Sequence, residues 1–270
     1  MPKFAANLSM LFTEFPFLDR FEHAARAGFS AVEFLFPYEH EPHEIRSRLD
    51  RHGLQLVLHN LPAGDWAAGD RGIACHPAMI GEFREGVAAA VRYAKALGVR
   101  QLNCLCGKAP AGVARGELRA TLVANLRYAA DRFEDEGLRL LVEPINTFDI
   151  PGFVASTTDE ALALIDDAGS RNIFLQYDIY HAQRMEGEIA NSLAKHLPRI
   201  AHVQIADNPG RGEPGTGEIN YAFLFRHLDR IGYDGWVGCE YNPTTAATED
   251  SFLWLPAMVE RDVEEAEQLT

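Results

Sequence analysis

The feature of this sequence that most constrains its fold is a glycine that recurs between a helical stretch and an apolar, β-rich run. Glycine adopts positive φ at little cost, so it often closes a helix just before the chain enters a strand. The six junctions are Gly28, Gly53, Gly98, Gly137, Gly169 and Gly232. The repeated order of helix, glycine and strand predicts a chain in which helices and strands alternate.

Two further apolar runs bring the number of strand candidates to eight. The eight runs cover residues 3–9, 29–36, 54–59, 99–106, 138–145, 172–178, 199–206 and 236–241. Dividing 270 residues by eight gives about 34 per unit, the length of one strand with its crossover helix. The runs are nearly continuously apolar, as in parallel strands covered by helices on both faces. We therefore predict one (β/α)8 TIM barrel domain over residues 1–270, with a doubly wound open sheet as the alternative.

Two segments between the strand candidates have the pattern of amphipathic helices. Apolar residues recur every three or four positions over 80–94 and over 118–133, which places them on one helix face. The spacing of Thr157 and Glu160 is that of a capping box, so a helix should begin near Thr158. The longest irregular segments, 60–78 and 207–218, have the length of binding loops or lids.

Four consecutive strand candidates, the fifth to the eighth, end in a carboxylate or an amide. These residues are Glu143, Asp178, Gln204 and Glu240. In a TIM barrel the carboxyl-terminal ends of the strands meet at one mouth, where catalytic residues lie. Carboxylates gathered there repel one another unless a divalent cation joins them, and all-oxygen ligation favours Mg²⁺ or Mn²⁺. We predict a metal site formed by these four side chains; the alternative is that each caps a loop or pairs with an arginine.

A metal between two carboxylates suits removal of a proton next to a carbonyl group. The metal polarises the substrate oxygens and stabilises an enediolate. One carboxylate removes the α-proton and the other returns a proton to the neighbouring carbon, and Glu143 and Glu240 are the natural pair. The chain has no Gly-Lys-Ser/Thr phosphate loop, no G-x-G-x-x-G motif before a helix and no G-x-S-x-G elbow. These observations predict an isomerase or epimerase without a nucleotide cofactor.

The charge of the chain restricts its partners. There are 25 Lys and Arg residues against 39 Asp and Glu residues, a formal net charge of −14. So acidic a protein repels phosphate backbones, which argues against nucleic acid and anionic membranes as partners. A small anionic substrate remains compatible, because a local cation inverts the field inside a pocket. With four cysteines, no signal peptide and no long apolar run, we expect a cytoplasmic protein with reduced thiols.

Two histidines and one loop are further site candidates. His59 ends the third strand candidate, and His181 lies three residues after Asp178. We predict that both contact substrate oxygens, with a purely structural role as the alternative. The glycine-rich segment 210–218 either cradles a phosphate or carries Arg211 over the mouth of the barrel.

Long sequence blocks carry a family resemblance over nearly the whole chain. The blocks are residues 7–12, 32–38, 59–66, 142–146, 176–181, 204–209, 213–221 and 235–241. In them the chain resembles hydroxypyruvate isomerase, within the sugar-isomerase and endonuclease IV-like group of barrels. The resemblance implies reversible conversion of hydroxypyruvate to tartronate semialdehyde, a step of glyoxylate metabolism. It also implies that Glu143 and Glu240 transfer the protons.

The resemblance leaves the substrate and the metal partly open. Related ketose epimerases bind their metal through Glu, Asp, His and Glu, whereas this chain has Gln204 at the third position. A neutral amide oxygen is a weaker ligand than imidazole. The alternatives are a 2-oxo-tetronate isomerase, which shares the opening and closing blocks, and a ketose 3-epimerase. Residues 60–75 resemble hydroxypyruvate isomerase more closely.

A hydroxy-keto acid substrate carries a carboxylate and requires a cationic partner. Arg211 and Lys108 are the first candidates and Arg71 is the third; the alternative is that each is a solvated surface charge.

Two other classes of function remain. Metal-dependent cleavage of damaged DNA would require more histidine ligands and a basic face. A binding protein for sugar acids would keep the pocket without needing a proton-transfer pair. The sequence is compatible with a homo-oligomer, and residues 260–268 are expected to form a solvated helix or a frayed tail.

Overall fold

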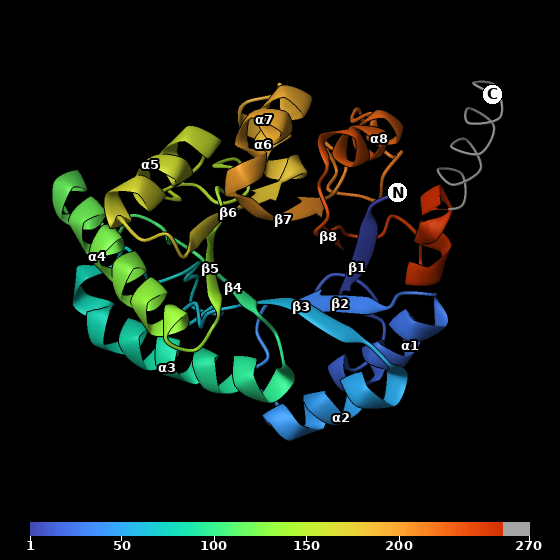
Figure 1. Ribbon diagram of the computed structural model, residues 1–270, viewed down its shortest axis with the longest axis horizontal. Helices are drawn as coiled ribbons and strands as arrows, with labels where there is room; N and C mark the ends of the chain where they lie inside the picture. Colours follow the sequence, from blue (N-terminus) through green and yellow to red (C-terminus); the bar gives the residue numbers. More distant parts are fainter. Residues whose placement is uncertain (256–270) are drawn as a thin grey trace.

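The computed structural model describes residues 1–255, and its eight strands form a closed parallel barrel in sequence order (Figure 1). This confirms the predicted (β/α)8 barrel and excludes the open sheet. The expected tail at 260–268 lies outside the described residues. The strands are β1 (Lys3–Asn7), β2 (Ala31–Phe34), β3 (Gln55–Asn60), β4 (Gln101–Cys104), β5 (Arg139–Val142), β6 (Ile173–Asp178), β7 (Ile200–Ile205) and β8 (Trp236–Cys239).

Helices surround the barrel on its outside, and each crossover between neighbouring strands contains at least one (Figure 1). They are α1 (Arg20–Arg26), α2 (Pro42–His52), α3 (Ile80–Leu97), α4 (Arg115–Glu134), α5 (Thr158–Ala168), α6 (Ile179–Met185), α7 (Ile189–His196) and α8 (Tyr221–Ile231). Short 3₁₀ helices cover Phe17–Asp19, Pro77–Met79, Leu197–Arg199 and Thr248–Phe252. No helix among residues 1–255 is long and apolar enough to cross a membrane.

The helix boundaries follow the local signals in the sequence. The Thr157 hydroxyl accepts the backbone N–H of Glu160, and α5 begins at Thr158 as predicted. Gly53 and Gly98 close α2 and α3 in the left-handed conformation, with φ of 65° and 75°. Seven of the eight predicted strands are too long, as where 138–145 shortens to Arg139–Val142, whereas the third has the predicted length. Residues beyond Val142 stay buried without pairing to a neighbouring strand, so apolar character alone overestimates strand length.

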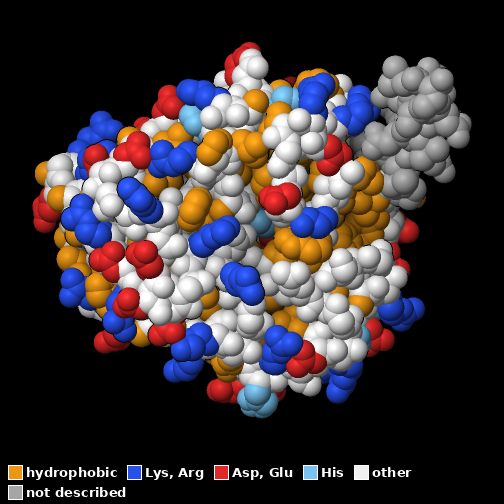
Figure 2. Space-filling view, viewed as in Figure 1, with side chains coloured by type: hydrophobic (Ala, Val, Ile, Leu, Met, Phe, Trp, Pro, Cys, Tyr) orange, Lys and Arg blue, Asp and Glu red, His pale blue; other side chains and the backbone are white. Residues whose placement is uncertain are grey.

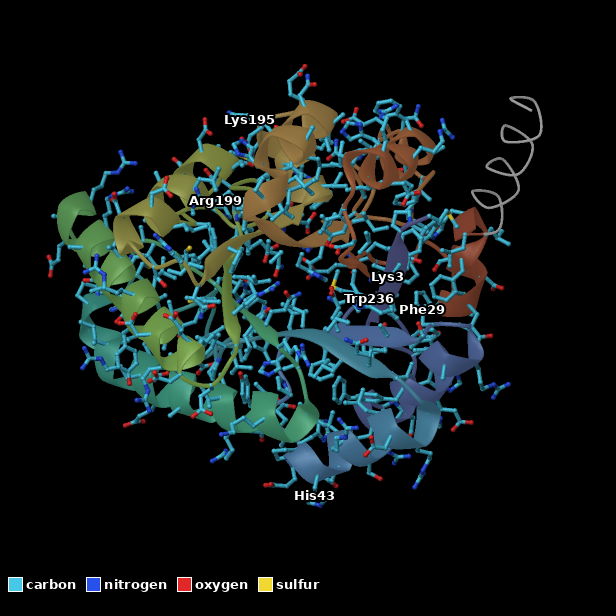
Figure 3. All side chains as sticks on the ribbon, in the orientation of Figure 1. Lys3, Phe29, His43, Lys195, Arg199 and Trp236 are labelled. Atoms are coloured by element: carbon cyan, nitrogen blue, oxygen red, sulfur yellow. The ribbon has the colours of Figure 1, made fainter. Side chains whose placement is uncertain are left out.

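Inside the barrel, an apolar cluster in the amino-terminal half is followed by polar side chains towards the carboxyl-terminal end. A small apolar cluster fills the first part; its buried members are Ala5, Ala31, Val57, Leu58 and Leu141. Lys3 and Trp236 begin β1 and β8 there, with the Lys3 Nζ 5.3 Å from the centre of the Trp236 ring (Figure 3). The buried polar residues come later in the strands and include Asn7, Glu33, Asn103, Gln176 and Gln204. A much larger apolar core joins the barrel to its helices.

The surface in this view carries both signs of charge. Figure 2 shows Lys and Arg side chains interspersed with Asp and Glu side chains, without a continuous basic area on this face. Such a mixture does not present the extended positive surface that a nucleic-acid backbone binds to.

Candidate active site

A cavity of about 260 Å³ lies at the carboxyl-terminal mouth of the barrel. Glu143 directly follows β5 and Glu240 directly follows β8, so the barrel brings both carboxyl groups to this mouth. The charged and aromatic residues that line the cavity include Glu143, Glu240, His181, Arg211, Arg71 and Trp66. The two predicted proton-transfer residues therefore share one chamber with a histidine and two arginines.

The carboxyl groups of the cavity are held in a low-dielectric environment. Glu143 is 4% exposed, and burial together with Glu240 and Asp178 raises its pKa well above the usual range. Burial raises the pKa of Glu240 to about 8, although the nearby Arg211 guanidinium acts to lower it. The Arg211 Nη2 lies 3.6 Å from the Glu240 Oε1. Glu240 can therefore change protonation state near neutral pH, as acid–base catalysis requires, and the Glu143 carboxyl group holds its proton more tightly than a free glutamate does.

Glu143, Asp178 and His181 form a buried group that could hold a metal ion. One ligand atom from each lies within 4.8 Å of the others. The Asp178 Oδ1 accepts the backbone N–H groups of Tyr180 and His181, at 2.7 and 3.3 Å. The Asp178 Oδ2 is buried without a hydrogen-bond partner among the described residues. An uncommitted carboxylate oxygen beside a second carboxylate fits a divalent cation, because burying such an atom without a partner is costly.

Gln204 lies in β7 with both ends of its amide engaged. Its Nε2 donates to the Glu33 Oε1 at 2.7 Å, and its Oε1 accepts from the Gln176 Nε2 at 2.5 Å. The Gln176 Nε2 also donates to the Glu143 Oε2 at 2.9 Å. The Gln176 amide therefore donates to both Gln204 and Glu143. An amide oxygen can accept two hydrogen bonds, so the Gln204 Oε1 has a second lone pair available for a metal ion. Its role as a metal ligand, like that of Glu240, stays a prediction.

Glu33 is a buried carboxyl group that the sequence reasoning missed. It is 0% exposed and accepts hydrogen bonds from Asn7 at 3.0 Å and from His202 at 2.6 Å, besides the one from Gln204. Gly238 on β8, which is separated from β2 by β1, leaves the space for this carboxyl, since a Cβ there would overlap both Oε atoms. A glutamate inside the apolar strand Ala31–Phe34 is a signal that could have revealed it.

Of the two histidines predicted to contact the substrate, His181 lines the cavity and His59 does not. His181 lines the cavity, with its Nε2 3.7 Å from the Glu143 Oε1 and 3.8 Å from the Asp178 Oδ2. His59 is 0% exposed and is not among the lining residues; its Nδ1 lies 3.0 Å from the backbone oxygen of Asn60. Burial lowers the pKa of His59 to about 4.

Arg211 and Arg71 line the cavity, whereas Lys108 does not. The Lys108 Nζ donates to the backbone oxygen of Gly69 at 3.1 Å in an exposed setting. Arg71 stacks on Trp66 at 4.0 Å and donates to the Trp66 backbone oxygen, so the loop after β3 presents both side chains together.

The glycine-rich loop after β7 is organised from within. The Asp207 Oδ2 accepts the backbone N–H groups of Gly215 and Gly217, both at 2.9 Å. Asp207 therefore occupies the backbone donors that a phosphate would need. Of the two predicted roles, this favours a loop that carries Arg211 to the mouth of the barrel, and it argues against a phosphate site.

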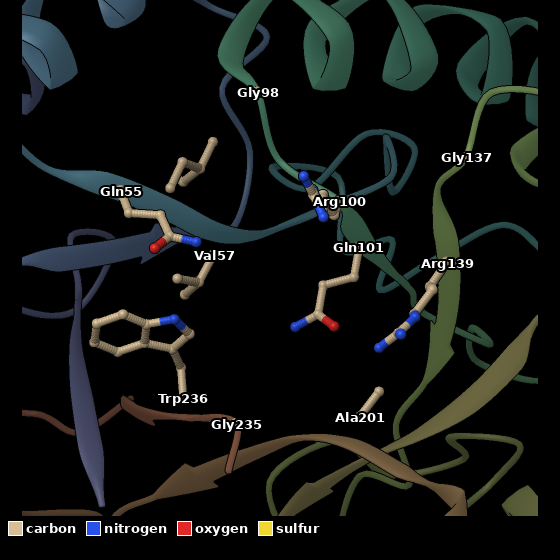
Figure 4. Close-up of a pocket in the computed structure, with 11 residues that line it drawn as sticks. Gln55, Val57, Gly98, Arg100, Gln101, Gly137, Arg139, Ala201, Gly235 and Trp236 are labelled. Atoms are coloured by element: carbon tan, nitrogen blue, oxygen red, sulfur yellow. The ribbon is translucent and has the colours of Figure 1, made fainter.

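A second cavity, of about 370 Å³, opens at the opposite end of the barrel (Figure 4). It lies among the first residues of β3, β4, β5 and β8, which are Gln55, Gln101, Arg139 and Trp236. None of its lining residues carries a carboxyl group. The predicted proton-transfer pair, Glu143 and Glu240, lines the cavity at the carboxyl-terminal mouth instead.

The sequence matches the family model described as xylose isomerase-like TIM barrel over residues 21–258. The chain belongs to this family. Compared with individual proteins, the chain is 58% identical over 255 residues to hydroxypyruvate isomerase of Escherichia coli. The match covers 94% of this chain and 98% of that protein. It is 46% identical to 2-oxo-tetronate isomerase of Cupriavidus necator, with the same coverage of both chains.

One solved structure superimposes closely on this barrel. It is a Brucella melitensis protein titled AP endonuclease, family 2, with a TM-score of 0.92 and 46% sequence identity, covering 95% of this chain and 99% of that one. The two proteins therefore share the fold over nearly their whole length.

Proposed function

We propose that this protein is a hydroxypyruvate isomerase that interconverts hydroxypyruvate and tartronate semialdehyde. The observation that carries the proposal is the 58% identity to the Escherichia coli hydroxypyruvate isomerase over almost the full length of both proteins. The cavity supports it, because two buried carboxyl groups of raised pKa share it with two arginines.

The chemistry is a proton shift between adjacent carbons. One carboxylate removes a proton from the hydroxymethyl carbon, which gives an enediolate, and a carboxylic acid returns a proton to the former carbonyl carbon. The proton of the original hydroxyl group passes to the former carbonyl oxygen, which leaves an aldehyde beside the new alcohol. Arg211 stabilises the charged form of Glu240, which suits it to act as the base. Burial and the neighbouring Glu240 and Asp178 raise the pKa of Glu143, which suits it to return the proton.

The metal set is proposed to comprise Glu143, Asp178, Gln204 and Glu240, with Mg²⁺ or Mn²⁺ as the ion. A bound divalent cation would polarise the two substrate oxygens and offset the charge of the enediolate. The residues around it contribute independently of the ion. Asn103 and Gln176 donate to the Glu143 Oε2 at 2.8 and 2.9 Å, which fixes the orientation of that carboxyl group.

The substrate carboxylate is proposed to pair with Arg211, with Arg71 on the facing loop as a second cation. Both side chains line the cavity, and neither forms an ion pair of hydrogen-bond length with a carboxylate in the described part of the chain. Their free donors are therefore available to an anionic group.

The proposal includes glyoxylate metabolism as the setting and the cytoplasm as the location. The support for a reducing compartment is that Cys75, Cys104, Cys106 and Cys239 are all free and buried.

A 2-oxo-tetronate isomerase is the second candidate, because a relative of that name is 46% identical over the same length. Measurement of kcat/KM for hydroxypyruvate and for a 2-oxo-tetronate on metal-loaded enzyme decides between them. We expect hydroxypyruvate to be preferred. A preference for the four-carbon acid would replace the proposal with the second candidate, and turnover of neither would reject both.

A further inference from the structure

Asn146 is a buried residue, four positions after the end of β5. Its side chain contacts the Nδ1 of His181. Its Oδ1 accepts the backbone N–H groups of Phe148 and Asp149, at 3.1 and 2.9 Å. Two backbone donors can face only an oxygen, so the orientation of the amide is fixed. The Nδ2 then lies on the opposite side, 3.0 Å from the Asp149 Oδ2 and 2.7 Å from the His181 Nδ1.

The contact with Asn146 determines which ring nitrogen of His181 carries the proton. An amide NH2 only donates, so the His181 Nδ1 must accept and cannot carry a proton. A ring whose Nδ1 accepts a hydrogen bond from an amide NH2 is the neutral form, because the imidazolium carries a proton on both nitrogens. Its single proton therefore resides on Nε2.

The protonated Nε2 faces the cavity. Its distances of 3.7 Å to Glu143 and 3.8 Å to Asp178 are too long for direct hydrogen bonds. A histidine that binds a metal normally donates its other N–H to a carboxylate or a carbonyl. Here the partner of the other nitrogen is a donor, which is the opposite arrangement.

We infer that Asn146 is a positioning residue that makes His181 a hydrogen-bond donor to a substrate oxygen and prevents it from acting as a metal ligand. The inference rests on the proposed isomerase function for the identity of the substrate. A neutral N–H directed at an oxygen that gains charge in the enediolate stabilises the transition state.

The first test reads the tautomer directly by long-range ¹H–¹⁵N NMR of labelled enzyme. The spectrum is recorded after EDTA treatment and again with saturating Mg²⁺, and His181→Gln assigns the signal. We expect a protonated Nε2 and an unprotonated Nδ1 under both conditions. Protonation of Nδ1 in either state would overturn the inference.

The second test exchanges the two neighbouring side chains in the double variant N146D/D149N, with D149N as the matched control. The exchange keeps an amide and a carboxylate side by side, but places the carboxylate against the His181 Nδ1. We expect the tautomer to reverse and kcat to fall about 10²-fold below that of D149N, with KM within about threefold. An unchanged tautomer, or equal kcat in the two variants, would contradict the inference.

Asn146→Ala provides the same readout if the exchange variant does not fold. It removes the donor without adding charge, so signals of both tautomers should appear; a single wild-type signal would contradict the inference. The NMR result is independent of turnover. Loss of the proposed substrate reaction in the wild type would reject the function, while the tautomer would still test the role of Asn146 on His181.

Discussion

At the residue scale, the site depends on carboxyl groups whose environment disfavours their charge. Glu143, Asp178 and Glu240 are all buried, and burial is the largest contribution to the raised pKa of each. Arg211 is the cation that faces them, and it favours the charged forms. Removing one carboxyl should therefore affect the chemistry far more than the fold.

Replacing Glu240 by glutamine should lower kcat by about 10²–10⁴-fold, the range expected for loss of a general acid or base. The amide has almost the same shape and removes a buried charge, so the melting temperature should change little. Glu186→Gln is the matched control, because that carboxyl binds Thr158 outside the cavity. Near-normal turnover by the Glu240 variant would remove this residue from the mechanism.

His59 should make the protein less stable as the pH falls. Its folded pKa of about 4 lies below the unfolded value of 6.5, so the unfolded chain binds the proton more readily. Stability is therefore lost as the pH falls from 6.5 to about 4, by roughly 3 kcal/mol in total. Denaturant unfolding of wild type and His59→Gln across this range checks it, and the variant should lose less stability. Equal pH dependence in both proteins would contradict the assignment.

At the scale of elements, the sequence predicted the order of strands and helices because each boundary has a local cause. Glycines close α2 and α3, and Thr157 caps α5. Strand ends were placed less well, because burial continues beyond the last paired residue, as after Val142. Pairing depends on the neighbouring strand, which a single strand sequence does not contain.

Positions at strand ends predicted Glu143 and Glu240 in the cavity, since the barrel brings consecutive strand ends together. The position of Lys108 outside the cavity depends on the path of a long loop, which spacing does not determine. Glu33 was missed because its partners His202 and Gln204 lie 169 and 171 positions away in the sequence. The pattern around a single strand contains no sign of such distant partners.

The approach of β8 to Glu33 on β2 should not tolerate a side chain at Gly238. A Cβ would overlap both carboxyl oxygens of Glu33, so Gly238→Ala should lower the free energy of unfolding by about 1–3 kcal/mol. Gly81→Ala in α3 is the control, since nothing lies within 4 Å of its Cβ. That helical change should be neutral or stabilising. Equal stability of the two variants would contradict the tight packing at Gly238.

At the scale of the whole molecule, metal binding should be visible as thermal stabilisation. A ligand that binds only the folded state at 100 times its Kd adds about 2.7 kcal/mol, or about 5–10 °C in Tm for a chain of this size. We expect Mn²⁺ or Mg²⁺ to raise Tm, EDTA to reverse the rise and Asp178→Asn to abolish it. A rise of equal size in the Asp178 variant would place the metal elsewhere.

The central claim is that this barrel moves a proton between adjacent carbons of hydroxypyruvate. The most direct test incubates metal-loaded enzyme with hydroxypyruvate in D2O and follows deuterium incorporation and tartronate semialdehyde by NMR, with Glu240→Gln and EDTA-treated enzyme in parallel. We expect conversion with deuterium exchange that both the variant and metal removal suppress. Folded, metal-loaded enzyme that yields neither exchange nor product would contradict it.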